Sequence, residues 1–272
     1  AVVVDDALMS ITHIIRGDDH ISNTPRQVLI FEAIGFACPS YAHIPLVLST
    51  DKTPLGKRHE SASIRSLREE GFLPEAVLNT AARLGWQPGE GLLGLEEMAR
   101  SFSIDRLSKS PSVFDMDRLR YFSKLSIERT DSLRLIKLAG IGCEGVDEDR
   151  LKEIVGLLKP NAVTLNDLKG LIRPFTGGKM AASDEALSVL REPYARAVVK
   201  AARAGVEGLA AIDEAAYVRV IKGVKEATGE KGRRLYMPIR CALTGQTEGI
   251  ELVNVLKILG RVTAMERLKG FE

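Results

Sequence analysis

The stretch Ile11-Thr12-His13-Ile14-Ile15-Arg16, followed by Gly17-Asp18-Asp19-His20, decides the fold of the N-terminal part of the chain. It is short and rich in β-branched residues, which favours a strand. A second apolar run over Ile44 to Leu48 predicts another strand. Residues that directly follow a parallel strand lie where α/β proteins bind ligands, so Gly17 to His20 are candidates for a site.

One helix is expected between these two strands. Thr24 can cap it, Pro25 suits its first position, and Gln27 completes a capping box. Val28 to Ile34 would supply its buried face, and Gly35 would end it. The order strand, helix, strand predicts a parallel βαβ unit.

The first six residues, Ala1-Val2-Val3-Val4-Asp5-Asp6, are apolar and β-branched before two acids. Such a run predicts a strand that lacks its neighbours. We therefore expect this chain to be a fragment whose N-terminal part is missing.

From residue 61 onward the pattern is helical. A cap or Pro precedes each predicted helix and Gly or Pro follows it. The polar stretch from Leu125 to Ser132 is the predicted domain boundary. The predicted helices are Ser63 to Gly71, Pro74 to Gly85, Asp115 to Lys124, Asp147 to Leu158, Pro193 to Gly205, Asp213 to Gly229, Pro238 to Gly245 and Glu251 to Gly260.

Composition narrows the class of protein. The chain has 272 residues, 45% apolar and 27% charged, which is typical of a folded globular protein. Its 38 basic and 36 acidic residues exclude a polycation, so any nucleic-acid surface must be a local patch. Neither an 18-residue apolar run nor a signal-peptide pattern is present, which predicts a cytosolic protein. The three widely spaced cysteines are expected to be buried thiols.

The loop from Asp51 to His59 carries two adjacent cations, Lys57 and Arg58. A Pro and a Gly precede them in the loop, and a His follows. Such a loop could hold a polyphosphate. It is not a P-loop, because Asp51 and Arg58 stand where that motif needs Gly and Ser or Thr. An ordinary solvated loop is the alternative, and the spacing alone leaves both open.

Several motifs together resemble bacterial glutamyl-tRNA synthetases, which are class I aminoacyl-tRNA synthetases. The resemblance extends over essentially the whole chain. It rests on Val3-Val4-Asp5-Asp6, on Thr12 to His20, on Asn23-Thr24-Pro25-Arg26-Gln27, on Gly71 to Ala76, on Leu107 to Asp115 and on Met237 to Gly245.

The resemblance implies a mainly α protein with an α/β N-terminal part. Residues 1–62 would form the second half of a Rossmann-like catalytic domain, and residues 63–130 a helical connecting region that contacts the tRNA stem. Residues 131–190 and 191–272 would be two anticodon-binding helical subdomains. The implied activity is ATP- and Mg²⁺-dependent attachment of L-glutamate to tRNA(Glu) through a glutamyl-adenylate, by a cytoplasmic monomer without membrane contact.

The resemblance also implies roles for individual residues. Pro54-Leu55-Gly56-Lys57-Arg58 matches a family loop that reads approximately Lys-Leu-Ser-Lys-Arg, so Lys57 and Arg58 would be catalytic and the whole loop would bind ATP. Gly56 and Pro54 depart from that pattern. Leu46 and Val47 would lie against the adenine, and Asp19 would line the nucleotide cleft.

Arg16 and His20 would bind the substrate. A guanidinium offers a carboxylate two parallel hydrogen bonds and keeps its charge when partly desolvated. An ion pair of Arg16 with Asp18 or Asp19 is the alternative. The four histidines, residues 13, 20, 43 and 59, have no metal-site spacing, so no metal site is expected.

The His-x-Gly-His motif of class I synthetases does not occur in the sequence. Half of the ATP site is therefore expected to be missing, and the isolated chain is expected to be inactive. A non-catalytic tRNA-binding module or pseudoenzyme from the same family is the main alternative. An unrelated nucleotide-binding α/β protein is a third.

The segment from Tyr217 to Arg240 has seven basic and two acidic residues and could follow RNA phosphates. Its alternative is a solvated helix face. Arg191, Arg196, Lys200 and Arg203 would add a second basic face. The acidic stretch from Glu144 to Glu153 should face away from RNA, and Tyr121 to Lys124 departs from the family pattern.

Overall fold

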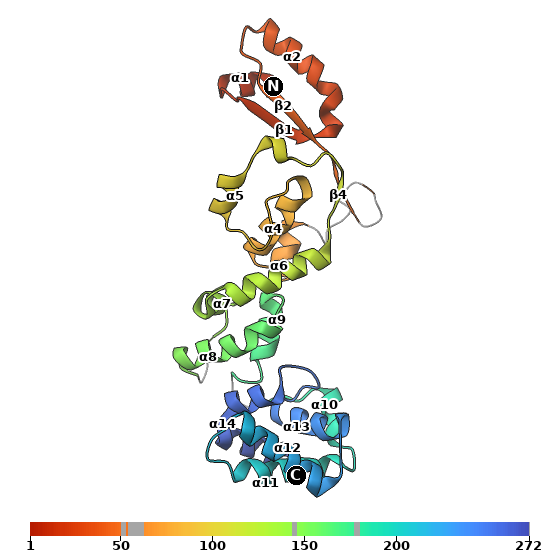
Figure 1. Ribbon diagram of the computed structural model, residues 1–272, viewed down its shortest axis with the longest axis vertical. Coiled ribbons are helices and arrows are strands. Elements are labelled where there is room, and N and C mark those ends of the chain that lie inside the picture. Colours follow the sequence, from red (N-terminus) through yellow and green to blue (C-terminus); the bar gives the residue numbers. More distant parts are fainter. Residues whose placement is uncertain (50–52, 54–62, 143–145, 177–179, 272) are drawn as a thin grey trace. The chain divides into compact units, whose positions relative to one another are not determined.

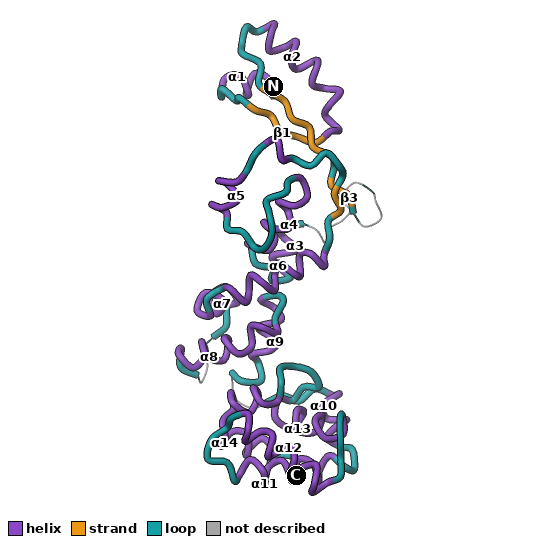
Figure 2. The backbone as a smooth tube through the Cα atoms, in the orientation of Figure 1, coloured by secondary structure: helices purple, strands orange, loops and turns teal. Residues whose placement is uncertain are grey.

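The computed structural model describes residues 1–49, 53, 63–142, 146–176 and 180–271. It divides into two compact units, Ala1–Arg129 and Thr130–Glu272 (Figure 1). Within the described residues, the strands belong to the first unit (Figure 2). Across the same part of the chain, no helix combines the length and apolar character needed to cross a bilayer.

A parallel βαβ unit opens the chain after one short helix. Strand β1 (His13–Gly17) pairs in parallel with β2 (Ser40–Ile44), and Arg16 lies opposite His43. The 3-10 helix η1 (Asp18–Asn23) and helix α2 (Thr24–Ala33) connect the strands. The predicted strand, helix, strand order is therefore confirmed.

The second strand lies earlier in the chain than predicted. The apolar run from Ile44 to Leu48 is not one strand, because Pro45 has no N–H to donate to a sheet ladder. Strand β2 ends at Ile44, and Val47–Leu48 forms a separate short strand, β3. β3 pairs in parallel with β4 (Ser112–Val113).

The N-terminal strand prediction is wrong, because residues Val2–Leu8 form helix α1. Val3 and Ala7 lie four residues apart, on one face of the helix, and pack against Phe31 of α2. Burial of this face outweighs the weak strand preference of three consecutive valines.

A helical cluster completes the first unit. Helix α4 (Pro74–Gly85) packs against α6 (Met116–Arg129). The core of the cluster consists of Leu67, Phe72, Ala76, Leu119 and Phe122. The predicted boundary stretch is still helical as far as Arg129, where the first unit ends. The elements are α3 (Ile64–Glu69), α4 (Pro74–Gly85), α5 (Leu95–Ser101), η3 (Ile104–Arg106) and α6 (Met116–Arg129).

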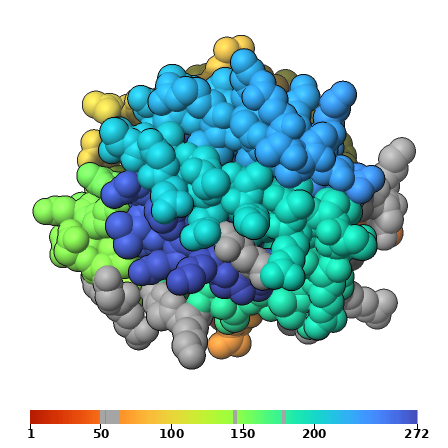
Figure 3. Space-filling view, turned by 90° about the horizontal axis from the view of Figure 1, so that it is seen from below, coloured from red at the N-terminus to blue at the C-terminus, as the bar shows by residue number. Residues whose placement is uncertain are grey.

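The second unit is all-helical and has two groups. In the first group α7, α8 and α9 pack on one another, and in the second α11 packs against α12, α13 and α14. Figure 3 shows α11 and α12 side by side on one face of this unit. The elements are α7 (Ser132–Ala139), α8 (Glu148–Leu158), η4 (Lys159–Asn161), α9 (Leu165–Ile172), α10 (Asp184–Leu190), α11 (Ala195–Glu207), α12 (Glu214–Thr228), α13 (Arg233–Thr244) and α14 (Leu252–Lys269).

Capping residues set most helix starts in this unit. The carboxylates of Asp147 and Asp213 accept backbone N–H groups of α8 and α12, as the sequence predicts. Helix α13 differs, because it begins at Arg233 and contains Pro238. Buried Leu235 lies on the first turn of α13, and its burial outweighs the hydrogen bond that the proline removes.

Gly245 ends α13 in a left-handed conformation with φ of 71°. A Cβ atom there would lie 2.7 Å from the carbonyl oxygen of Ala181. The Gly245 carbonyl also accepts a hydrogen bond from the N–H of Ser183 at 2.9 Å. Only glycine fits this close backbone contact between α13 and the segment before α10.

Of the three cysteines, Cys143 lies outside the described residues, and the other two differ in exposure. Cys241 is buried, and burial raises the pKa of its thiol to about 11. Cys38 is exposed, so the prediction of buried thiols is wrong for this residue. It lies in the connection that leads from α2 to β2.

Candidate functional site

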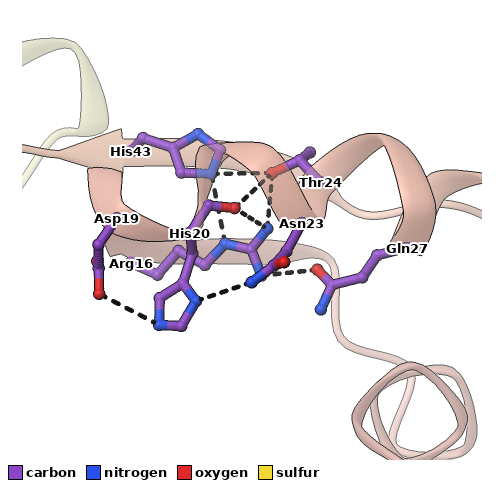
Figure 4. Close-up of polar contacts among 7 residues, drawn as sticks. All are labelled: Arg16, Asp19, His20, Asn23, Thr24, Gln27 and His43. Carbon is purple, nitrogen blue, oxygen red and sulfur yellow. Dashed lines mark hydrogen bonds and ion pairs between the residues drawn. The ribbon is translucent and has the colours of Figure 1, made fainter.

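Arg16 stands near the end of β1, and its guanidinium is held from three sides (Figure 4). Nη1 donates to Gln27 Oε1 at 2.6 Å, and Nη2 donates to Thr24 Oγ1 at 2.6 Å. Nε donates to His43 Nε2 at 3.3 Å. The ring of Tyr41 lies 5.0 Å from the guanidinium carbon. These contacts fix both the position and the plane of the charged group.

No carboxylate neutralises Arg16 among the described residues. Its remaining contact is a long hydrogen bond of 3.4 Å from Nη2 to the carbonyl oxygen of His20. Asp19 instead lies 3.7 Å from His20 Nε2. The alternative of an ion pair between Arg16 and Asp18 or Asp19 is therefore wrong, and the positive charge is available to a ligand.

The side chains of Thr24 and Gln27 accept hydrogen bonds from Arg16 and do not form the predicted capping box. The N-cap of α2 is Asn23, and no side chain forms a cap hydrogen bond there. Thr24 Oγ1 also lies 3.0 Å from His43 Nε2. The first turn of α2 thus supplies two acceptors that orient the guanidinium.

Asp19 and His20 lie on η1, immediately after β1, as a site at the carboxyl end of the strand requires. The His20 ring contacts Asn23 Nδ2 at 3.3 Å, and its side chain is about half exposed, at 52%. A Cβ atom on Gly17 would collide with the Asp19 carboxylate and come within 3.4 Å of Leu46 Cδ2. Leu46 and Asp19 therefore both approach the backbone at Gly17.

Three of the predicted nucleotide contacts, Asp19, Leu46 and Val47, lie among the described residues. Val47 starts β3, directly after Leu46. The loop residues Pro54 to Arg58, including Lys57, lie outside the described residues. The polyphosphate and solvated-loop interpretations of that loop both stay predictions.

The three described histidines, His13, His20 and His43, do not gather around a common point. His43 contacts Arg16 and Thr24, His13 lies 2.9 Å from Thr12 Oγ1, and His59 lies outside the described residues. In the described ranges, no three potential metal ligands lie close together.

The basic segment of the second unit comprises α12, the turn after it and the start of α13. Its six cations up to Arg234 are exposed, although two of them pair with acids. Lys222 lies 3.9 Å from Glu226, and Arg234 lies 3.0 Å from Glu230. The exposed cations are Arg219, Lys222, Lys225, Lys231, Arg233 and Arg234.

The second basic face is joined to this segment through an aromatic contact. The guanidinium of Arg234 lies 4.3 Å from the ring centre of Tyr194, which precedes α11. Arg191, Arg196 and Lys200 are exposed nearby in sequence, whereas Arg203 is half-buried. We name the exposed cations of these two faces the basic surface. The acids Glu148 and Glu153 lie on α8, in the other helical group.

Arg240 does not belong to the basic surface, contrary to the prediction. Its Nη1 donates to the carbonyl oxygen of Ile250 at 2.7 Å, and burial lowers the pKa of its guanidinium. We expect Arg240→Met to lower the free energy of unfolding by about 1–3 kcal/mol, because the Ile250 carbonyl loses a charged donor.

Urea unfolding followed by circular dichroism measures this effect. Arg233→Met is the matched control, since it removes an exposed cation from the same helix and should leave stability nearly unchanged. Equal stability of the two variants would contradict a structural role for Arg240.

Comparison with known proteins decides the family. Residues 1–121 match the family model for the catalytic domain of class I tRNA synthetases for Glu and Gln, and residues 118–271 match an anticodon binding domain. The chain belongs to the class I tRNA synthetase family. The resemblance that the motifs indicate is thereby confirmed, as is a mainly helical protein with catalytic and anticodon-binding parts.

Relatives extend this result along the chain. Glutamate–tRNA ligase of Carboxydothermus hydrogenoformans is 36% identical over 98% of this chain, and glutamate–tRNA ligase 2 of Syntrophus aciditrophicus is 39% identical over 99%. A crystal structure of a glutamate tRNA ligase from Elizabethkingia meningosepticum superposes with a TM-score of 0.79 over 98% of this chain, at 23% identity. The chain spans 58%, 57% and 58% of those three proteins, respectively.

Proposed function

We propose that this chain supplies the glutamate-recognition and tRNA-binding parts of a cytoplasmic, monomeric glutamate–tRNA ligase. The observation that carries the proposal is the guanidinium of Arg16, which four side chains position and which has no carboxylate partner among the described residues. A charge held in this way is ready for an anionic substrate group.

The side-chain carboxylate of glutamate fits the unused donors of Arg16. Gln27 and Thr24 each take one N–H from the two Nη atoms, which leaves one N–H on Nη1. The second N–H of Nη2 makes only the 3.4 Å contact with His20. A carboxylate can replace that weak bond and accept both N–H groups in parallel.

ATP would activate the α-carboxylate of the bound glutamate. Lys57 would stabilise the negative charge that develops as pyrophosphate leaves, while Leu46 and Val47 would contact the adenine. At nucleotide sites Mg²⁺ is usually held by substrate phosphates together with one or two carboxylates. Asp19 offers one carboxylate at the end of β1.

The basic surface would follow the tRNA backbone. We expect the chain to bind tRNA in a strongly salt-dependent way, because each neutralised phosphate releases counterions. Reversing Arg233 and Arg234 to Glu should weaken binding and lower the slope of log affinity against log salt by about one or more. Filter binding over a range of salt concentrations measures both quantities.

Reversal of Glu148 and Glu153 to Lys on α8 is the control, since those acids are not part of the basic surface. An unchanged affinity of the Arg233→Glu, Arg234→Glu variant would remove α13 from the RNA interface.

A non-catalytic tRNA-binding module is the second candidate, because residues 118–271 match an anticodon binding domain. A chimera separates the two functions. It joins this chain to the part of the Carboxydothermus hydrogenoformans ligase that the chain does not cover. The ligase proposal predicts glutamate-dependent pyrophosphate exchange by the chimera and none by the chain alone. A folded chimera that binds tRNA without exchange would support the binding module.

A further inference from the structure

A hollow of about 750 Å³ lies in the helical cluster of the first unit, between the end of α4, the following loop and α6. Three arginines line it, with Trp86, Tyr121 and Phe122 as aromatic neighbours and Glu90 as its single acid. Neither Arg16 nor the basic surface contributes to it. Its size suits a ligand of the dimensions of a nucleotide.

Two of the arginines build the wall of the hollow. Arg83 donates to the carbonyl oxygens of Gly89 and Gly91 at 2.7 Å each, and to Asn79 at 2.9 and 3.1 Å. Arg106 donates to the carbonyl oxygen of Gln87 at 2.5 Å. These partners are neutral, so they fix the loop without cancelling the charge.

The third arginine, Arg118, does not help to fix the loop. The side chain of Arg118 is exposed and has no hydrogen-bond or ion-pair partner among the described residues. Burial, and after it the nearby charge of Arg118, lowers the pKa of Arg83. Like charges gathered in this way repel one another, and an anion placed between them would relieve the repulsion.

The aromatic groups favour a nucleotide over a simple anion. The Tyr121 ring is 58% exposed and lies edge-on to Phe122, with ring centres 5.3 Å apart. An exposed ring beside arginines can stack a base while the arginines take its phosphate.

We propose that this hollow binds one nucleoside monophosphate unit, with its phosphate on Arg118 and its base on Tyr121. The unit is either a free nucleotide or one residue of a bound RNA, and both share this chemistry. A free-nucleotide site would go beyond the proposed function, whereas a site for an RNA residue rests on the tRNA contact that the family resemblance implies for residues 63–130.

The chain carries its own reporter for this site, because Trp86 is its single tryptophan. Its fluorescence is titrated with AMP, with a short single-stranded RNA and with inorganic phosphate, using the complete 272-residue chain. We expect a saturable change with AMP or RNA, and a much weaker response to phosphate alone. Saturation by AMP identifies a free-nucleotide site, whereas saturation by RNA alone identifies an RNA residue.

Variants test the two contacts separately. Arg118→Ala should weaken binding about tenfold, which is typical of one lost charged hydrogen bond. Arg120→Ala is the matched control, because Arg120 lies on the same helix, pairs with Asp117 at 3.9 Å and does not line the hollow. Tyr121→Phe should retain affinity and Tyr121→Ala should lose it.

Circular dichroism confirms that each variant is folded. The proposal is overturned if neither AMP nor RNA saturates the signal, or if Arg118→Ala and Arg120→Ala weaken binding equally. An equal response to poly-glutamate would also overturn it, because that result would mean a site for acidic peptides. The chimera's pyrophosphate exchange is measured separately, so failure here leaves the ligase proposal standing.

Discussion

In the chimera, replacing Lys57 with alanine is expected to lower the rate of glutamyl-adenylate formation by about 10²–10³. The lysine is proposed to act on charge that appears only as pyrophosphate leaves, so its loss should reduce turnover more than ATP binding. Glutamate-dependent pyrophosphate exchange measures the rate, and the KM for ATP separates binding from turnover.

Affinity for tRNA should barely change in Lys57→Ala, because the proposed contact is with ATP. Lys57→Arg keeps the positive charge and should recover part of the rate. If exchange by Lys57→Ala is unimpaired, the loop from Asp51 to His59 is an ordinary solvated loop.

Arg16→Ala is expected to lower kcat/KM for glutamate roughly 30-fold to 10³-fold. This change corresponds to a loss of about 2–4 kcal/mol of transition-state stabilisation. The substrate carboxylate would lose its charged partner inside the site. Any activation of glutamine should fall much less, because its amide has no charge to pair. The ratio of exchange rates with the two amino acids is the decisive measurement.

Arg26→Ala is the matched control, because Arg26 is an exposed cation on the neighbouring helix α2. Arg16→Lys should recover little activity, since an ammonium cannot reproduce the planar fork that Gln27 and Thr24 hold. A near-normal glutamate rate in Arg16→Ala would show that this residue only stabilises the fold.

The sequence alone predicts the βαβ unit and the place of Arg16, because strand and helix periodicities are local signals. The partners of Arg16 were harder to predict. Thr24 and Gln27 have the spacing of a capping box, and only the pairing of β1 with β2 brings His43 opposite Arg16. A local sequence pattern cannot show that Arg16, on the neighbouring strand β1, binds the side chains of Thr24 and Gln27 in place of a capping box.

The errors elsewhere have the same physical origin. Val2 to Val4 favour a strand by their own preference, but packing against Phe31 makes them helical. Arg240 belongs to a basic segment in sequence, yet the Ile250 carbonyl draws it into the fold. The sequence analysis also lacks four short helices, for a different reason. Helices of seven or eight residues leave little periodicity to detect, and α5, α7, α9 and α10 have these lengths.

The chain divides into two compact units, and this division affects how the unfolding of the protein must be measured. The single tryptophan, Trp86, lies in the first unit, so its emission follows the loss of that unit's core. Helical ellipticity comes from both units. We expect the two signals to give different midpoints in a denaturant titration, which means that one cooperative transition cannot describe the chain. Each free energy of unfolding then belongs to one unit.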